Sequence, residues 1–152
     1  MKTMKWTLID KSCWPVGPWS EEADKMQWQD KATGLPCLIH RNYAGSLCGY
    51  VGVAAGHPYY KEYYGEANVE EKISVHGGLT YSGFCQDEKD GICHIPEKGE
   101  PDKVWWFGFD CAHAGDLSPR IPTMMPHETY KDVAYVKKEV GNLAKQLKGI
   151  LK

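Results

Sequence analysis

The stretch Val104–Asp110, VWWFGFD, decides the fold that the sequence predicts. It is nearly continuously apolar up to its final aspartate, which is typical of an interior β-strand covered on both faces. We therefore expect a central strand here. Its end brings the polar residues that follow it, beginning with Asp110, to one edge of a sheet.

Two apolar runs upstream predict a β-hairpin. Leu35–Arg41 (LPCLIHR) and Leu47–Val53 (LCGYVGV) flank Asn42–Ser46, a sequence typical of a hairpin loop. Gly49 and Gly52 in the second run indicate bulges or a close approach of another part of the chain. Shorter strands are expected over residues 6–9, 25–30, 73–76 and 79–84, together with a short helix capped by Ser20.

The C-terminal residues 129–148 predict an amphipathic helix. Thr129 and Asp132 fit a capping box at its start, and Gly149 marks its end. Gly141 costs about 1 kcal/mol relative to alanine inside a helix, which indicates close packing at that point. An apolar stripe with spacings of three and four residues follows the cap: Val133, Val136, Val140, Leu143 and Leu147.

The order of these elements, strands first and a helix last, predicts a single α+β domain over residues 1–152. We expect a mostly antiparallel, twisted sheet with the C-terminal helix packed on it. Residues 85–103 (CQDEKDGICHIPEKGEPDK) are rich in charge, glycine and proline, and therefore predict a long excursion over the surface.

Composition limits the classes of function. Six Trp and nine Tyr add apolar area to a modest aliphatic content, and predict an aromatic core or an aromatic-lined pocket. No apolar run in the sequence approaches the roughly 20 residues that span a bilayer. Residues Met1–Asp10 lack the apolar centre of a signal peptide. With a net charge of -2 and only two arginines, Arg41 and Arg120, nucleic acid is not an expected partner. A cytoplasmic protein that does not bind membranes is expected.

The six cysteines are expected to be reduced and structural. None of them is part of a Cys-x-x-Cys motif, and the chain is longer than typical disulfide-stapled domains. Their positions are 13, 37, 48, 85, 93 and 111. A weaker alternative is a zinc site in which Cys85, Cys93 and His94 act with Cys13 or Cys111, but the irregular spacing argues against it.

The richest concentration of polar chemistry follows the central strand. Asp110, His113 and Asp116 are spaced three apart, and His76 ends another predicted strand just before Gly77. Two carboxylates and imidazoles suit either a metal site or an acid–base pair. The alternative is structural, because an aspartate at this position can cap the turn that follows and the histidines can be satisfied within the fold.

Several neighbours complete a possible pocket around this group. The nearest aromatic residues in the sequence are Tyr81, which follows His76, and Trp105 and Trp106, which precede Asp110. Arg120 can pair with a phosphate or carboxylate. The aromatic loop 56–64 (GHPYYKEYY) can form a separate wall that stacks on a ring or base. Neither His-Glu-x-x-His nor Gly-x-Ser-x-Gly occurs, so these motifs assign no reaction.

Four stretches together resemble a family of small proteins encoded by tailed bacteriophages and prophages. They are Leu47–Pro58 (LCGYVGVAAGHP), His76–Tyr81 (HGGLTY), Trp105–Asp116 (WWFGFDCAHAGD) and the helix over 131–147. The resemblance spans most of residues 26–147, and it leaves 85–103 as an elaboration of this chain. It implies a phage origin and action in the cytoplasm of the infected host, without implying a reaction.

Three functions are compatible with these observations. The leading hypothesis is a binding module, without a cofactor, that sequesters a small polar, nucleotide-like molecule such as a host defence signal. Its expected ligand-binding residues are His76, Gly77, Tyr81, Trp105, Trp106, Asp110, His113, Asp116 and Arg120.

The alternative is a hydrolase in which Asp110, His113 and Asp116, with or without His76, bind a divalent metal that activates water. Its substrate would be a phosphoester or glycosidic bond of a small nucleotide. The third hypothesis is a protein inhibitor whose exposed Trp and Tyr residues bind a host enzyme. A homo-oligomer is compatible with each of the three.

Overall fold

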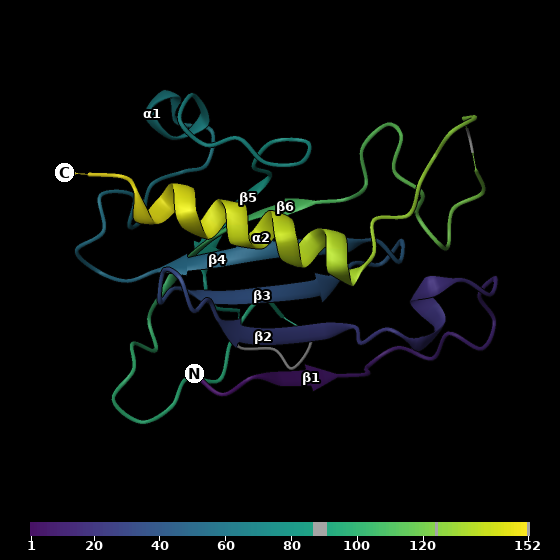
Figure 1. The fold of residues 1–152 in the computed structure, drawn as a ribbon, viewed down its shortest axis with the longest axis horizontal. Coiled ribbons are helices and arrows are strands. Elements are labelled where there is room, and N and C mark those ends of the chain that lie inside the picture. The colour runs from purple at the N-terminus through teal and green to yellow at the C-terminus, as the bar shows by residue number, and fades with distance from the viewer. Residues whose placement is uncertain (87–90, 124, 152) are drawn as a thin grey trace.

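The computed structural model describes residues 1–86, 91–123 and 125–151, and shows one antiparallel sheet with a long helix across one face (Figure 1). The strand order is β1-β2-β3-β4-β6-β5, and each neighbouring pair is antiparallel. This confirms the predicted α+β class. The strands are β1 (Met4–Trp6), β2 (Lys25–Gln29), β3 (Pro36–Arg41), β4 (Leu47–Val53), β5 (Tyr81–Phe84) and β6 (Trp105–Asp110); the helices are η1 (Pro18–Glu21), α1 (Ala67–Glu70) and α2 (Val133–Lys148).

The predicted central strand is β6, which lies inside the sheet between β4 and β5. Its side chains alternate between two apolar layers. Phe107 and Phe109 are buried under α2, whereas Trp106 is buried in a second cluster that includes Leu38 and Tyr50. Coverage of both faces therefore explains why the sequence of β6 is continuously apolar.

The long helix packs on β4 and β3 through the predicted apolar stripe. Gly49 of β4 makes this contact possible, because a Cβ atom there would lie 2.6 Å from both Phe109 and Val140. The expected close approach is thus confirmed at Gly49, and the pairing with β3 and β6 continues through it in register, without a bulge. The close packing expected at Gly141 is wrong, since nothing lies within 4 Å of a Cβ built there.

Both predicted helix caps differ from the structure. The first residue of α2 is Val133, and its cap is Asp132, whose carboxylate accepts a hydrogen bond from the backbone of Tyr135 at 2.9 Å. Thr129 instead pairs with Asp116 in a parallel β-bridge. At η1, Ser20 is not the cap but the third residue, and its hydroxyl accepts a hydrogen bond from the amide of Gly17.

The expected strand over 73–76 is absent, although this segment is fully described. Its backbone donors are taken by side chains of α2: Ser74 N donates to Gln146 Oε1, and His76 N donates to Glu139 Oε1, each at 2.8 Å. A turn over 75–78 follows, so the chain re-enters the sheet only at Tyr81. The helix therefore fixes this segment, and strand pairing does not.

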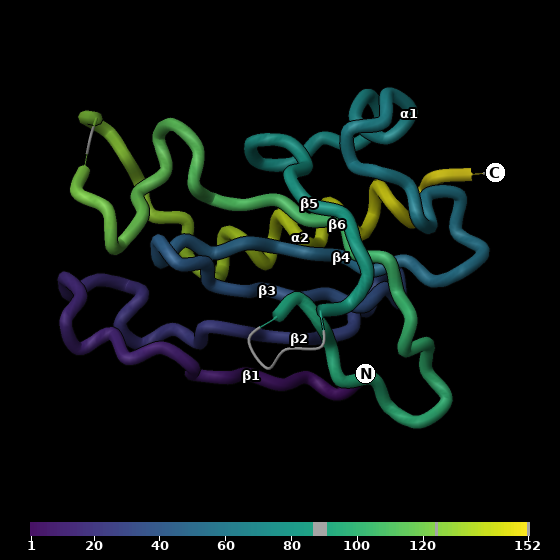
Figure 2. The backbone as a smooth tube through the Cα atoms, turned by 180° about the vertical axis from the view of Figure 1, so that it is seen from behind, coloured from purple at the N-terminus to yellow at the C-terminus, as the bar shows by residue number. Residues whose placement is uncertain are grey.

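The excursion after β5 crosses the face of the sheet that lies opposite α2 (Figure 2). It is not only a surface loop, because Ile92 and His94 are buried against Trp106. The side chain of Gln27 on β2 fixes its backbone, accepting a hydrogen bond from Ile95 N at 2.8 Å. Part of the segment predicted as solvent-exposed thus completes the second apolar layer.

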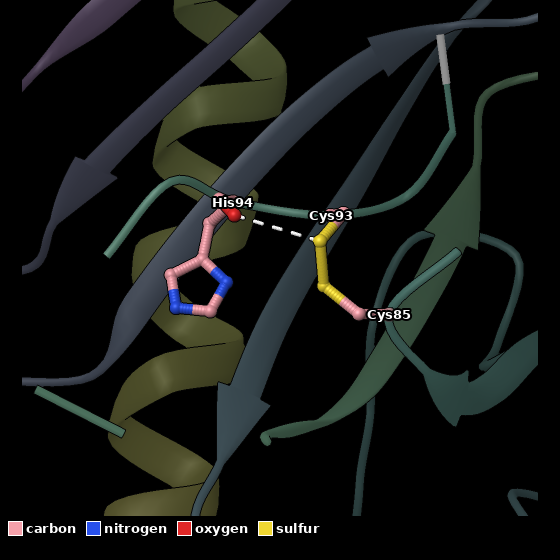
Figure 3. Close-up of side chains that lie close together, drawn as sticks. All are labelled: Cys85, Cys93 and His94. Carbon is pink, nitrogen blue, oxygen red and sulfur yellow. Dashed lines mark hydrogen bonds between the residues drawn. A yellow bond between two sulfur atoms is a disulfide. The ribbon is translucent and has the colours of Figure 1, made fainter. Parts of the chain in front are cut away.

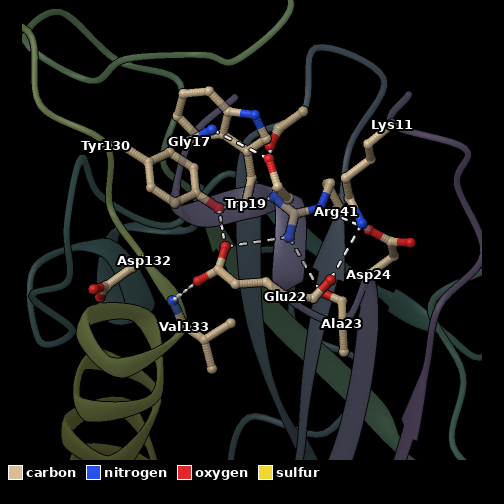
Figure 4. A network of polar contacts seen from close by, with 12 residues as sticks. Lys11, Gly17, Trp19, Glu22, Ala23, Asp24, Arg41, Tyr130, Asp132 and Val133 are labelled. Carbon is tan, nitrogen blue, oxygen red and sulfur yellow. Dashed lines mark hydrogen bonds and ion pairs between the residues drawn. The ribbon is translucent and has the colours of Figure 1, made fainter. Parts of the chain in front are cut away.

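A buried polar network ties the N-terminal segment to the start of α2 (Figure 4). Its centre is Arg41, which is 2% exposed and is therefore not the phosphate contact that its type allowed. Five hydrogen bonds account for the five N–H groups of its guanidinium. They go to Asp24 Oδ1, Glu22 Oε1, Tyr130 Oη and the carbonyl oxygens of Ala23 and Gly45.

Asp24 is the second hub of this network. Its other carboxylate oxygen accepts hydrogen bonds from the backbone of Leu8 at 2.8 Å and of Ile9 at 2.9 Å. These bonds take residues 8 and 9 out of the sheet, which explains why the edge strand lies at Met4–Trp6 and not at 6–9.

Candidate functional site

The main group of candidate residues forms where three segments meet. His76 lies in the turn after Val75, Asp110 ends β6, and His113 and Asp116 occupy the loop that follows. The sequence placed these residues on separate strand ends, and the structure brings them together. The rings of His76 and His113 are 6.1 Å apart between their centroids.

Asp116 is the buried centre of the group. Its carboxylate, 2% exposed, lies 2.8 Å from His76 Nε2, and it accepts hydrogen bonds from His113 N at 3.0 Å and from Lys131 Nζ at 3.1 Å. Burial alone would raise the pKa of Asp116, but the hydrogen bonds from His76, His113 and Lys131 outweigh it and lower this pKa. Asp116 is therefore ionised at neutral pH.

The hydrogen-bond partners of the His76 ring determine which of its nitrogen atoms carries the proton. An ionised carboxylate only accepts hydrogen bonds, so Nε2 of His76 carries the hydrogen that faces Asp116. The other nitrogen, Nδ1, lies 2.8 Å from the hydroxyl of Tyr135 on α2. A hydroxyl both donates and accepts, so Tyr135 can serve either tautomer of the ring.

The predicted glycine beside His76 has a specific steric role. Gly77 has φ +68, and a Cβ atom there would lie 2.3 to 2.7 Å from the ring atoms of His113. Only glycine meets both requirements. The group that closely approaches the backbone at Gly77 is therefore the His113 imidazole.

Asp110 caps the turn that follows β6, as the structural alternative predicted, and its carboxylate also contacts His113. Its Oδ1 accepts a hydrogen bond from Ala112 N at 3.1 Å, which caps the turn. The same oxygen lies 3.2 Å from His113 Nδ1, and Oδ2 accepts a hydrogen bond from Thr80 at 3.1 Å. Asp110 thus positions the His113 ring.

Sequence reasoning missed three members of the site. Lys131, Tyr135 and Glu139 contact Asp116, the His76 ring and the His76 backbone, respectively. Tyr135 and Glu139 are four residues apart in α2, and this spacing was an available signal because such residues lie along one side of a helix; Lys131 precedes the helix.

The arrangement can hold a metal ion. One ligand atom each from His76, His113 and Asp116 lies within 4.8 Å of the other two. Ligands of a tetrahedral ion with bonds of about 2.1 Å are roughly 3.4 Å apart, so shifts on the order of 1 Å would bring the three atoms into position. A metal on Nε2 of His76 would move its proton to Nδ1, where the hydroxyl of Tyr135 accepts it.

The aromatic residues predicted for this pocket lie elsewhere. Trp106 is fully buried on the other face of the sheet, and Tyr81 packs edge-on against Tyr50 on that face, with ring centroids 5.5 Å apart. Trp105 packs against Phe84 and donates a hydrogen bond to the carbonyl of Glu62. Because successive residues of a strand alternate in direction, neighbouring tryptophans cannot line one pocket.

Arg120 also lies apart from this group. Its guanidinium is 4.6 Å from the ring centroid of Tyr43 and 5.7 Å from that of Trp14, and it donates to the carbonyl of Tyr43. The nine-residue pocket predicted from the sequence therefore divides. His76, Gly77, Asp110, His113 and Asp116 are brought together, and Tyr81, Trp105, Trp106 and Arg120 are not.

The prediction that all six cysteines are reduced is wrong for one pair. Cys85 and Cys93 form a disulfide, whereas Cys13, Cys37, Cys48 and Cys111 are free. Loop closure by the excursion brings the pair together, and spacing alone did not reveal this. Cys111 is buried in the layer under α2, so it cannot complete a zinc site on the opposite face.

Comparisons with protein-family models, curated proteins and solved structures find no match. Within the described part of the chain, no helix has the length and apolar character needed to cross a bilayer. What the protein does is therefore inferred from its own geometry and chemistry.

Proposed function

We propose that the protein is a metal-dependent hydrolase that acts on a phosphoester of a small, nucleotide-like molecule. The observation that supports this function is the convergence of His76, His113 and Asp116. The two imidazole side chains are 18% and 34% exposed, so both remain accessible from solvent. Two imidazoles and a carboxylate are the protein ligands of known hydrolytic zinc centres, which keep one position for water.

The surrounding residues suit phosphoester chemistry. A divalent ion at this site would polarise a phosphoryl oxygen and lower the pKa of bound water, which supplies a nucleophile at neutral pH. Lys131 places an ammonium group 3.1 Å from Asp116, where it can also pair with a phosphate. Asp110 and Tyr135 orient the two imidazole rings from behind.

A second candidate function keeps the nucleotide-like ligand but involves no turnover. The rings of Tyr60 and Phe84 are edge-to-face at 5.9 Å, and Lys61 Nζ lies 5.7 and 5.9 Å from their centroids. With Lys103 they line a pocket of about 630 Å³. Aromatic rings stack on bases and ammonium groups pair with phosphates, so this pocket supports the sequestering module better than the His76 site does.

We also propose the setting that the sequence resemblance implies. In that setting the protein is made by a phage and acts in the host cytoplasm on a small phosphorylated host signal. A homo-oligomer remains a prediction that native mass spectrometry can check.

The two functions are separated by metal removal. We would dialyse the protein against a chelator, restore Zn²⁺ or Mn²⁺, and follow hydrolysis of bis(p-nitrophenyl) phosphate and of a panel of nucleotides. A hydrolase should require the metal and lose turnover in His113→Gln and Asp116→Asn. The matched control is His127→Gln, which changes an exposed histidine outside the site.

Thermal unfolding of each variant would show that it is folded, because Asp116 also holds Lys131 and His76 in place. Hydrolysis that survives chelation, or that is unchanged in folded His113→Gln, would reject the metal site. Nucleotide binding without product, lost in Lys61→Ala, would favour the sequestering pocket.

A further inference from the structure

A second group of potential metal ligands lies on the opposite face of the sheet. Cys85 follows β5, Cys93 and His94 belong to the excursion, and one ligand atom of each lies within 4.8 Å of the other two. Figure 3 shows the imidazole of His94 beside the linked sulfur atoms. These three residues are independent of the His76 site and have no part in the proposed hydrolysis.

His94 supplies a separate observation that points to a ligand. Its side chain lies in the apolar layer against Trp106, with only 6% of the residue exposed. Nδ1 nevertheless has no hydrogen-bond partner among the described residues. Nearly every buried polar atom in a folded protein has such a partner, so an unpaired imidazole nitrogen near two sulfur atoms indicates a missing one.

The oxidation state of the two sulfur atoms decides whether that partner can be a metal. In the disulfide, neither sulfur carries the negative charge of a thiolate, the form in which cysteine binds zinc. Once reduced, two thiolates and an imidazole form a ligand set that Zn²⁺ favours. We propose that reduction of the Cys85–Cys93 disulfide opens a zinc site, in which both thiolates and Nδ1 of His94 bind the ion.

The chemistry balances with one reductant. A dithiol supplies two electrons and two protons, so the S–S bond breaks, two thiols form, and the dithiol becomes a disulfide. Binding of Zn²⁺ then displaces one proton from each thiol. Oxidation of the pair by a disulfide reverses both steps and releases the ion.

The site has room for a fourth ligand. Cys85, Cys93 and His94 all line the pocket of about 630 Å³ that Tyr60, Lys61 and Phe84 also border. Three protein ligands leave one position of a tetrahedral ion for water or a small molecule. Two lysines, Lys61 and Lys103, and one acid, Asp102, line that opening, so its net charge is positive and a small anion is the class of molecule expected there.

Cobalt(II) provides the test, because thiolate ligands give Co²⁺ intense charge-transfer absorption that histidine and carboxylate ligands do not. The intact protein would be titrated with Co²⁺ under anaerobic conditions, before and after reduction with a phosphine that is then removed. We expect the band only after reduction, with one Co²⁺ per chain in this site and competition by Zn²⁺. Binding at the His76 site would give no such band, so the two sites are distinguished.

Cys85→Ser and Cys93→Ser should each lose the band, and His94→Gln should weaken Co²⁺ binding. The matched control, Cys13→Ser, removes an exposed free cysteine and should keep it. Circular dichroism would establish that each variant is folded. Absence of the band in the reduced wild type, or its persistence in a folded Cys93→Ser protein, would overturn the proposal.

Discussion

His76 and Asp116 are 40 positions apart in the sequence, yet His76 Nε2 lies 2.8 Å from Asp116 Oδ2. The contact joins the turn before β5 to the loop after β6. Tyr135 on the first turns of α2 holds the other nitrogen of the same ring. The helix that covers the sheet therefore also orients the candidate metal ligand, which couples the site to the packing of the fold.

The first prediction concerns this orientation. Tyr135→Phe removes the hydroxyl that accepts the Nδ1 proton when a metal occupies Nε2 of His76. Loss of such an outer partner weakens metal binding by about 10–100-fold. Competition with a chelating dye would measure the affinity, with Tyr43→Phe, 86% exposed, as the matched control. Equal affinities in the two variants would show that Tyr135 does not act on the site.

The second prediction separates steric conflict from backbone strain. Gly77 and Gly78 have φ of +68 and +81, but only a Cβ at Gly77 would meet the His113 ring. Gly78→Ala should cost about 1–2 kcal/mol, because alanine is strained in the left-handed region. Gly77→Ala should cost more and should also lower metal affinity. Urea unfolding and metal titration would measure both effects, and similar results for the two variants would contradict the role given to His113.

The sequence was sufficient for the framework because its signals are local. The alternation of residue types over 25–30, the hairpin loop and the stripe of α2 each depend on neighbouring residues, and each predicted a real element. The prediction of a strand over 73–76 was wrong because side chains of α2, far along the chain, accept hydrogen bonds from the backbone of this segment. The prediction of close packing at Gly141 was wrong because helix propensity gives the energetic cost of a glycine but does not show which atoms lie next to it.

The site was predictable only in part for the same reason. Polar residues that follow apolar runs can be found from the pattern, and His76, Asp110, His113 and Asp116 were, although the run before His76 forms no strand. Trp106 faces the side of the sheet opposite α2, and Trp105 lies at the other end of β6 from Asp110, so both were wrongly grouped with them. The spacing of Tyr135 and Glu139 indicates a shared helix face, but which residues that face contacts depends on how α2 crosses the sheet, and no local signal contains this.

The third prediction concerns acid stability. Burial would raise the pKa of Asp24, but hydrogen bonds from Lys11, Ile9, Leu8 and Arg41 outweigh it and lower this pKa in the folded state. A lowered pKa contributes stability that is complete above the unfolded value of about 3.9 and is lost as the pH falls through the folded value. Wild type should therefore lose stability as the pH falls below about 3.9.

Asp24→Asn should abolish that part of the acid dependence and cost about 3 kcal/mol at neutral pH, because it removes the charge that pairs with the buried Arg41 and with Lys11 and leaves Glu22 as the carboxylate beside Arg41. Urea unfolding between neutral and acidic pH would measure this, with the exposed Glu71→Gln as control. A variant as stable as wild type at neutral pH would show that Asp24 does not stabilise the network.

The fourth prediction is a stabilising change. Gly141 lies inside α2, where glycine is unfavourable by about 0.8–1.0 kcal/mol relative to alanine, and nothing lies within 4 Å of a Cβ built there. Gly141→Ala should therefore raise the free energy of unfolding by close to that amount. Gly49→Ala is the matched opposite, because its Cβ would lie 2.6 Å from Phe109 and Val140 and must push the helix away from the sheet. Urea unfolding of both variants would show opposite signs, and a loss of stability in Gly141→Ala would mean that α2 packs more closely at that point than the structure shows.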